Sequence, residues 1–330
     1  MSERAKIIAV VAALVVLVLY MQFGATSFVR LVITQALIFG ILAMSLDILL
    51  GYTGLPSLGQ AAYLGMGAYV AAILTTRFGF GLDWTFWLLI VLGFVIGAVT
   101  AAFFGLFAIR ATGVYFLMIT LALGQCVWGL AYRWNSLTGG DNGINMPGRP
   151  DFGLDLSNDM NFFYVVLGFF VATLAALYLL VKSPFGRSLV GIRESELRMR
   201  MLGYNTWLHK YVAFIIAGGF GGLAGVLWAF LNGLVSPEDV ILATSVDALL
   251  MVVLGGPGTL IGGVIGAGLV VFVREYLSTV VEWWQYVLGG MYVLTILYLP
   301  GGLMGIPERI RQRRAQAAGA VRAEAVSTSH

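Results

Sequence analysis

Residues that could carry acid–base, nucleophilic or metal chemistry are scarce in this chain. Its 330 residues include two histidines and one cysteine, namely His209, His330 and Cys126. These are too few for a zinc cluster or for a histidine-based catalytic triad. A phosphate-binding loop requires Gly-Lys-Ser/Thr, yet no glycine precedes any of the three lysines, Lys6, Lys182 and Lys210. We therefore expect no catalytic residue, no metal site and no cofactor, which argues against an enzyme.

Three acidic residues, Asp47, Asp247 and Glu275, fall within apolar segments. A charged side chain inside a bilayer costs about 2.5–3.5 kcal/mol on insertion scales. A proton-coupled carrier would place such groups opposite one another across a cavity. Because the sequence offers them no lysine or central arginine as a partner, we favour another interpretation. In it, Asp47 and Glu275 lie near the ends of spans and Asp247 caps a local break.

The elements that must position these residues are apolar helices. The chain is 60% hydrophobic and 11% charged, whereas soluble domains are about 25% charged. Apolar runs of about 20 residues, long enough to cross a bilayer, recur without the alternation of a barrel strand. The sequence predicts an all-α, polytopic integral membrane protein with 8–10 transmembrane helices and some broken, glycine-rich segments. The candidate spans are 7–23, 28–50, 60–77, 84–109, 113–132, 161–181, 211–235, 241–256, 258–274 and 279–299, and their number falls to eight if 241–274 dips in and returns.

The distribution of charge predicts the orientation of these spans. Six of the 19 Lys and Arg residues lie in 182–210 and five in 301–330, whereas 135–160 holds four aspartates and only Arg149. Because cytoplasmic loops are enriched in Lys and Arg, we expect 182–210 and both termini to be cytoplasmic and 135–160 to face outward. The net charge of +3 gives no indication of a nucleic-acid partner. Residues 1–27 are expected to form an uncleaved first span and an outward turn, and 307–330 a cytoplasmic polar tail.

Two segments interrupt the apolar pattern with glycine and proline: "GYTGLPSLGQAAYLGMGAY" at 51–69 and "GGPGTLIGGVIGAG" at 255–268. Such a pair, one in each half, is typical of a transporter's pathway. Glycines spaced by four residues elsewhere are better explained by tight helix packing.

Ser57 and Gln60 fit a capping box that starts a new helix after the first interruption. Unpaired backbone at membrane depth must be buried or line water. We therefore expect this break to line the pathway, with Tyr52, Thr53, Ser57, Gln60 and Tyr63 as its polar contacts.

The segment 182–210, "KSPFGRSLVGIRESELRMRMLGYNTWLHK", is basic and amphipathic. Ser183 and Pro184 are suited to start a helix, and Gly203 is suited to end one. Such a helix can lie on lipid headgroups or can dock on a cytoplasmic partner. The periodicity of the segment does not separate these two interpretations.

Several stretches resemble, in order, the LivM-type permease of branched-chain amino acid ABC importers. They are "LLGYTGLPSLGQAAYLGMGAYVAA", "ITLALGQ", "SLTGGDNG", "SPFGRSLVGIRESELRMRMLGYN", "AGGFGGLAGVLWAF", "SPE" and "LLMVVLGGPGTLIGGVIGA". The resemblance runs from about residue 35 to residue 306 and makes 28–306 the transmembrane domain of an importer permease. It implies a bacterial inner-membrane location and four partner subunits in addition to membrane lipid. These subunits are a LivH-type permease, two cytoplasmic ATPases that hydrolyse ATP, and a periplasmic substrate-binding protein.

The resemblance also implies roles for particular residues. The segment 182–210 becomes the ATPase-coupling segment, with Ile192, Arg193, Glu194, Glu196 and Gly203 as its contacts. The outward loop around Thr138, Gly139, Gly140 and Gly143 would face the binding protein. Thr120 and Gln125 of the motif "ITLALGQ", together with the intramembrane Asp247, complete the set of candidate pathway residues.

Alternatives to a branched-chain or apolar amino acid importer remain open. Permeases of urea or short-amide ABC importers look similar in the same motifs, and Gln60 stands where many relatives carry His. A secondary carrier without an ATPase is a less favoured reading. It would show intramembrane charge pairs and no long cytoplasmic docking segment.

Overall fold

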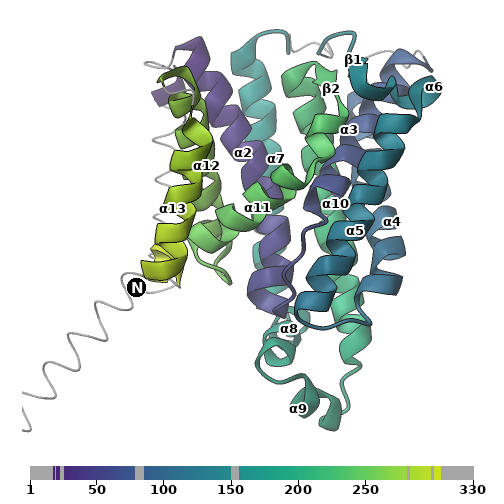
Figure 1. Ribbon diagram of the computed structural model, residues 1–330, viewed down its shortest axis with the longest axis vertical. Helices are drawn as coiled ribbons and strands as arrows, with labels where there is room; N and C mark the ends of the chain where they lie inside the picture. Colours follow the sequence, from purple (N-terminus) through teal and green to yellow (C-terminus); the bar gives the residue numbers. More distant parts are fainter. Residues whose placement is uncertain are drawn as a thin grey trace, which may run out of the picture.

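The computed structural model describes residues 18, 20–22, 26–78, 85–149, 156–280, 283–298 and 301–305 (Figure 1). Most of the predicted first span 7–23, and all of the tail 307–330, lie outside these residues. The helices of the described part are α2 (Ser27–Asp47), α3 (Gln60–Thr76), α4 (Thr85–Ala108), α5 (Val114–Arg133), α6 (Asn135–Thr138), α7 (Asp159–Lys182), α8 (Pro184–Glu194), α9 (Glu196–Met201), α10 (Thr206–Asn232), α11 (Leu242–Gly255), α12 (Leu260–Val280) and α13 (Trp284–Tyr298).

Short elements connect or extend the helices. A π-helical turn, η1 (Ile48–Thr53), continues α2, and two 3-10 turns are η2 (Gly140–Asn142) and η3 (Pro237–Val240). The strands β1 (Ile144–Asn145) and β2 (Leu234–Val235) pair antiparallel, with Ile144 opposite Val235. In Figure 1 this pair and α6 lie at one end of the bundle, called here the β1–β2 end, and α8 and α9 lie at the opposite end, the α8–α9 end.

Six helices of the described residues are long and apolar enough to cross a membrane. They are α2 with η1, α4, α5, α7, α10 and α12. These spans and the helical content of the described residues confirm the prediction of an all-α, polytopic membrane protein. The predicted spans 84–109, 113–132 and 161–181 agree with α4, α5 and α7 to within two residues at each end.

The region from 206 to 280 differs from the sequence prediction. The predicted span 211–235 begins five residues earlier, at Thr206, because the Asn205 side chain accepts a hydrogen bond from Leu208 N and starts α10 there. The predicted spans 241–256 and 258–274 are one short and one long helix. The 14 residues of α11 extend about 21 Å, less than the roughly 30 Å of a bilayer core, whereas α12 continues to Val280.

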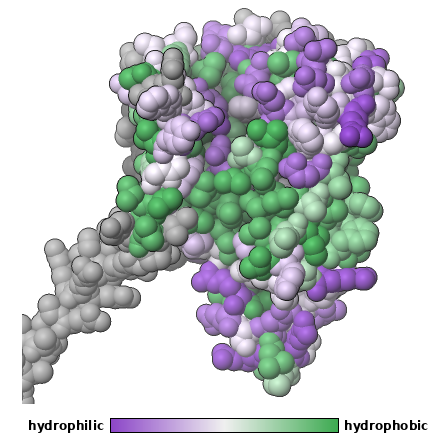
Figure 2. All heavy atoms as spheres, viewed as in Figure 1, coloured by the Kyte–Doolittle hydropathy of each residue, from purple (hydrophilic) through white to green (hydrophobic). Residues whose placement is uncertain are grey.

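The two most enclosed spans form the centre of the bundle. In α2 with η1 and in α10, 83% of the most apolar window is buried, compared with 28% in α5 and 22% in α7. The outer helices expose large apolar side chains such as Val91, Phe103 and Met118. Figure 2 shows an apolar band around the middle of the visible face, between polar regions at both ends. A band of this kind is the surface that lipid tails or another apolar partner would cover.

Glycines let α10 pack directly against the backbones of its neighbours. A Cβ atom on Gly222 would lie 2.2 Å from the carbonyl oxygen of Gly93 in α4, and one on Gly67 in α3 would lie 2.0 Å from the Gly222 carbonyl oxygen. Gly97 and Gly218 approach one another in the same way. This contact confirms that the glycines spaced by four residues serve close helix packing.

We predict that Gly222→Ala destabilises the bundle by about 1–3 kcal/mol, because an added methyl group must separate α10 from α4. The matched control is Gly268→Ala in α12, where an added Cβ meets nothing within 4 Å. Melting of the purified protein in detergent measures both effects. Equal melting temperatures for the two variants would contradict this packing.

Candidate transport cavity and coupling junction

The first interruption is a π-helical turn that ends α2. Within η1 the Thr53 hydroxyl donates to the carbonyl of Ile48 at 2.8 Å, and Gly54 follows with φ of +75°. Single π turns inside helices are frequent at functional sites. The chain then runs without regular structure to Gly59, and α3 begins at Gln60. The break predicted from glycine and proline is therefore present, at the end of α2.

The capping box predicted for Ser57 and Gln60 is wrong. Ser57 Oγ accepts from the N–H of Gly59 at 3.2 Å, but the Gln60 amide donates to Ser45 Oγ of α2 at 3.0 Å. The buried Gln60 side chain thus finds its partner on a neighbouring helix instead of on its own helix start. It ties the beginning of α3 to α2 across the break.

The second interruption meets the first. The Asp47 carboxylate accepts a hydrogen bond from the backbone N–H of Gly258 at 2.7 Å. A Cβ atom on Gly51 would lie 2.0 Å from Gly258 N and 2.1 Å from Asp47 Oδ1, so the two backbones touch. Gly258 has φ of +82°, a conformation that side chains disfavour. The carboxylate satisfies an N–H in the turn between α11 and α12 that helical bonding leaves free.

Arg193 of α8 joins both interruptions from the α8–α9 end. Its guanidinium donates to the carbonyl oxygen of Gly51. The same side chain lies against Gly54 and Gly258, where added Cβ atoms would be 2.9 Å from Arg193 Cγ and 3.1 Å from Nη1. We call Asp47, Gly51, Gly258 and Arg193 the junction. Through it, a residue of the predicted coupling segment contacts the broken backbone of the membrane domain.

The coupling segment starts and ends as predicted. Ser183 Oγ accepts from Gly186 N at 3.2 Å, and Pro184 is the first residue of α8. Gly203 follows α9 with φ of +86°, which a glycine adopts without strain. Ile192 is buried against the bundle, whereas Glu194 is exposed.

Glu196 has an intramolecular partner set that the sequence did not reveal. Its carboxylate accepts from Lys210 Nζ, from Arg200 Nη2 at 2.6 Å and from Thr206 Oγ1 at 3.1 Å. It therefore fixes α9 to the first turn of α10 and does not point outward. Partial burial raises the pKa of Glu196, but the hydrogen bonds from Lys210 and Arg200 outweigh this and hold the pKa below its ordinary value.

Exposed apolar side chains at the tip of the coupling segment were missed by the sequence analysis. Leu197 is 66% exposed, Met201 79% and Leu202 66%. The spacing of four between Leu197 and Met201 places them on one face of α9, and this spacing is the signal that could have found them.

The candidate pathway residues are mostly enclosed within the described chain. Thr53, Ser57, Gln60, Tyr63 and Thr120 are at most 3% exposed. Thr120 Oγ1 accepts from Leu58 N at 3.1 Å and so holds α5 against the break.

The other three lie nearer to open space. Tyr52 and Gln125 are partly exposed, and Asp247 lines a cavity. The assignment of all eight residues to a transport pathway stays a prediction.

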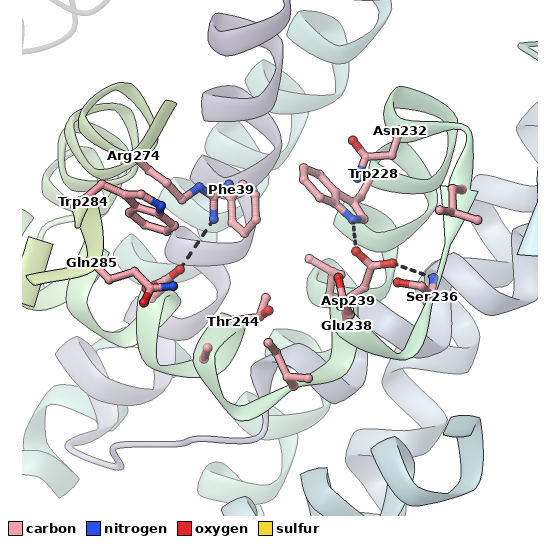
Figure 3. Close-up of a pocket in the computed structure, with 15 residues that line it drawn as sticks. Phe39, Trp228, Asn232, Ser236, Glu238, Asp239, Thr244, Arg274, Trp284 and Gln285 are labelled. Carbon is pink, nitrogen blue, oxygen red and sulfur yellow. Dashed lines mark hydrogen bonds and ion pairs between the residues drawn. The ribbon is translucent and has the colours of Figure 1, made fainter. Parts of the chain in front are cut away.

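The cavity around Asp247 measures about 520 Å³ and lies among α2, α3, α10, the β2–α11 connection, α11, α12 and α13 (Figure 3). In it, Asp247 faces Arg274 with an Oδ2–Nη1 distance of 3.6 Å. The expectation that no arginine could partner Asp247 is therefore wrong. The predicted span ended at Arg274, which placed this residue at a membrane surface, whereas α12 carries it inside the bundle.

An aromatic wall connects the two charged sides of the cavity. Figure 3 shows Arg274 and Trp284 on one side, Asp239 and Ser236 on the other, and Phe39 and Trp228 between them. Trp228 Nε1 donates to Asp239 Oδ1 at 2.7 Å, and the Ser236 N–H donates to Oδ2 at 2.9 Å.

The ring stack positions Arg274. The rings of Phe39 and Trp228 meet edge to face at 5.1 Å, and the Arg274 guanidinium lies 5.3 Å above the Phe39 ring centre. This geometry favours a cation–π attraction that holds the guanidinium in place.

The amino-acid sequence has counterparts among known proteins. The family described as branched-chain amino acid transport system / permease component matches residues 28–297. The chain belongs to this permease family. The resemblance to LivM-type permeases found in the sequence motifs is thereby confirmed, and the six apolar spans agree with a multi-pass membrane protein.

Individual relatives include both permease types. The permease is 32% identical over 311 residues to the high-affinity branched-chain amino acid transport system permease protein LivM of Salmonella typhimurium, covering 87% of this chain and 72% of that protein. It is 26% identical over 298 residues to LivH of Escherichia coli, covering 84% and 94%. A probable LivM of Methanocaldococcus jannaschii is 26% identical over 315 residues, covering 82% and 90%. No solved structure matches the chain.

We predict a pH-dependent stabilisation by Glu196. Because its pKa is lowered in the folded state, the ionised carboxylate stabilises the fold above its ordinary pKa of about 4.3. This stabilisation is lost as the pH falls through the lower folded value. Glu196→Gln should melt at a lower temperature than the parent at neutral pH, and the difference should close on acidification.

The control for this prediction is Glu194→Gln, which alters the exposed neighbouring carboxylate. It should change the melting temperature less at neutral pH. A Glu196→Gln effect that is the same at neutral pH and below the lowered folded pKa would contradict the assigned ion pairs.

Proposed function

We propose that this permease is a LivM-type subunit of an ATP-driven importer for branched-chain or other apolar amino acids in a bacterial inner membrane. Its partners are a LivH-type permease, two cytoplasmic ATPase subunits and a periplasmic substrate-binding protein. The likeness to both LivM and LivH proteins supports two related permeases in one complex. In this proposal both termini and the α8–α9 end are cytoplasmic.

The observation that carries the proposal is the bond from Arg193 to the Gly51 carbonyl. An importer driven by ATP hydrolysed in another subunit needs an element that contacts that subunit and also the membrane domain. The α8–α9 segment suits both requirements, since it lies at the end of the bundle and reaches the junction through Arg193 (Figure 1).

The tip of α9 supplies the surface for an ATPase. Figure 2 shows polar residues around this end of the molecule, which separate an apolar patch at the tip from the apolar band. The patch is that of Leu197, Met201 and Leu202. This separation favours a protein partner over the bilayer that covers the band, and so favours docking over a helix lying on lipid headgroups.

The sharpest test reconstitutes the four membrane and ATPase subunits in liposomes with the binding protein and measures leucine uptake. We expect uptake that requires ATP on the α8–α9 side. Met201→Glu should reduce ATPase co-purification and uptake, because a buried, unpaired charge opposes docking. Trp134→Ser, which alters an exposed apolar residue at the other end, should retain the ATPase.

Uptake by the permeases alone, driven by a proton gradient, would overturn the proposal in favour of a secondary carrier. Normal ATPase binding by Met201→Glu would instead favour the interpretation that α9 lies on lipid headgroups. Calorimetry of the binding protein with leucine, isoleucine, valine and urea identifies the cargo. Binding of urea alone would assign the complex to the urea and short-amide importers.

A further inference from the structure

The Asp247–Arg274 pair is an ion pair with capacity left for a ligand. Its separation of 3.6 Å exceeds the roughly 2.7–2.9 Å of a charge-assisted hydrogen bond. Arg274 also lies 3.5 Å from Glu275, again without close contact. Both side chains of the pair remain about one fifth exposed, at 19% for Arg274 and 20% for Asp247, and both line the cavity.

Of the two further carboxylates that line the cavity, Asp239 is already engaged and Glu238 is exposed. Asp239 accepts from Trp228 Nε1 and from Ser236 N, so it fixes the β2–η3 turn to α10. Asp247 accepts no hydrogen bond of this quality from any described residue, and Arg274 keeps several of its five N–H donors. Asp247 and Arg274 are therefore an adjacent anion and cation whose hydrogen-bonding groups are not saturated by the described residues.

We propose that this pair binds the zwitterionic head group of an α-amino acid. The ammonium group contacts Asp247 and the carboxylate contacts Arg274, in an arrangement antiparallel to the protein's own pair. In an α-amino acid both charged groups are attached to one carbon, which matches two adjacent opposite charges on the protein. A zwitterion brings no net charge into the membrane domain, where an unpaired ion would be costly.

The remaining walls suit an apolar side chain. Phe39, Trp228 and Trp284 provide aromatic surface beside the pair, and Leu64 and Ile241 add aliphatic surface. A volume of about 520 Å³ lies within the roughly 300–1,000 Å³ of ordinary ligand pockets. The stack of Arg274 on Phe39 holds the guanidinium beside this apolar surface. The ligand carboxylate is then fixed by Arg274, while the apolar side chain of the ligand packs against the aromatic and aliphatic walls.

This inference rests on the proposed function and deepens it, because it names the residues that recognise the cargo within the membrane. It also separates the two substrate classes left open by the sequence. Urea and short amides carry no net charge and offer the adjacent cation and anion only neutral hydrogen-bonding groups. An amino acid presents a full opposite charge to each of them.

The test measures protection of a cysteine inside the cavity. Cys126, the lone and exposed cysteine, is replaced by Ser, and Thr244, which lines the cavity, by Cys. The purified permease complex, without ATP or binding protein, is treated with a small water-soluble thiol reagent. The probes are leucine, leucinamide without the carboxylate, 4-methylpentanoate without the amino group, and urea.

We expect leucine to slow the labelling, and the other three compounds to need at least tenfold higher concentrations for equal protection. Arg274→Gln and Asp247→Asn should each raise the half-protecting concentration of leucine at least tenfold, because each leaves one ligand charge unpaired. The matched control is Glu275→Gln. It removes the other carboxylate near Arg274, lies outside this cavity and should leave protection unchanged.

Equal protection by leucine and leucinamide, or no protection by leucine, would overturn the proposal. These ligand comparisons use the protein with its charges intact, so they decide the matter even if the Arg274 or Asp247 variants do not fold. The same preparation is assayed for ATP-driven leucine uptake. Uptake without protection rejects this site and leaves the importer in place, whereas protection without ATP-driven uptake retains the site and rejects the importer.

Discussion

The contact between the backbones of Gly51 and Gly258 is the constraint on which the rest of the structure depends. Each glycine lies in a segment where a membrane helix stops, and each stop leaves backbone groups that lipid cannot satisfy. The protein satisfies them mutually, through the Asp47 carboxylate on the Gly258 N–H and the Arg193 guanidinium on the Gly51 carbonyl. A side chain at Gly51 would occupy the position of Asp47 and of the opposite backbone. Glycine is therefore required there by space.

The junction lies between the coupling segment and the cavity. Gly258 is in the turn that joins α11 to α12, and these two helices carry Asp247 and Arg274. They pack without intervening side chains, since an added Cβ on Gly266 would lie 1.9 Å from the Met251 carbonyl oxygen. We infer that two helices packed this closely move together. We infer that a displacement of α8 reaches the charged pair of the cavity through Arg193, Gly258 and this helical hairpin.

The sequence predicted what depends on neighbouring residues and missed what depends on distant ones. Apolar length located α4, α5 and α7, and Ser183, Pro184 and Gly203 marked the ends of the coupling helices, because these are local effects. The two segments rich in glycine and proline predicted the two helix breaks, but not the contact between them. The partners of Gln60 and Arg274, and Lys210 beside Glu196, were missed because they lie on other helices, so that no local spacing reveals them. Arg200, four residues after Glu196 in α9, is the exception, because its spacing is that of a local ion pair. The predicted capping box was wrong for this reason, because the Gln60 side chain bonds to Ser45 of α2 and not to the start of its own helix.

We infer that the junction transmits to the cavity a movement of the coupling segment that ATP drives in the partner subunits. The most direct measurement compares the labelling rate of Thr244→Cys, in the Cys126→Ser background, with and without ATP in the complete complex. We expect an ATP-dependent rate in the parent and in Arg187→Gln, which removes an exposed charge from the same helix. In Arg193→Gln we expect no ATP dependence, although ATP is still hydrolysed. An unchanged ATP dependence in Arg193→Gln would contradict transmission through the junction.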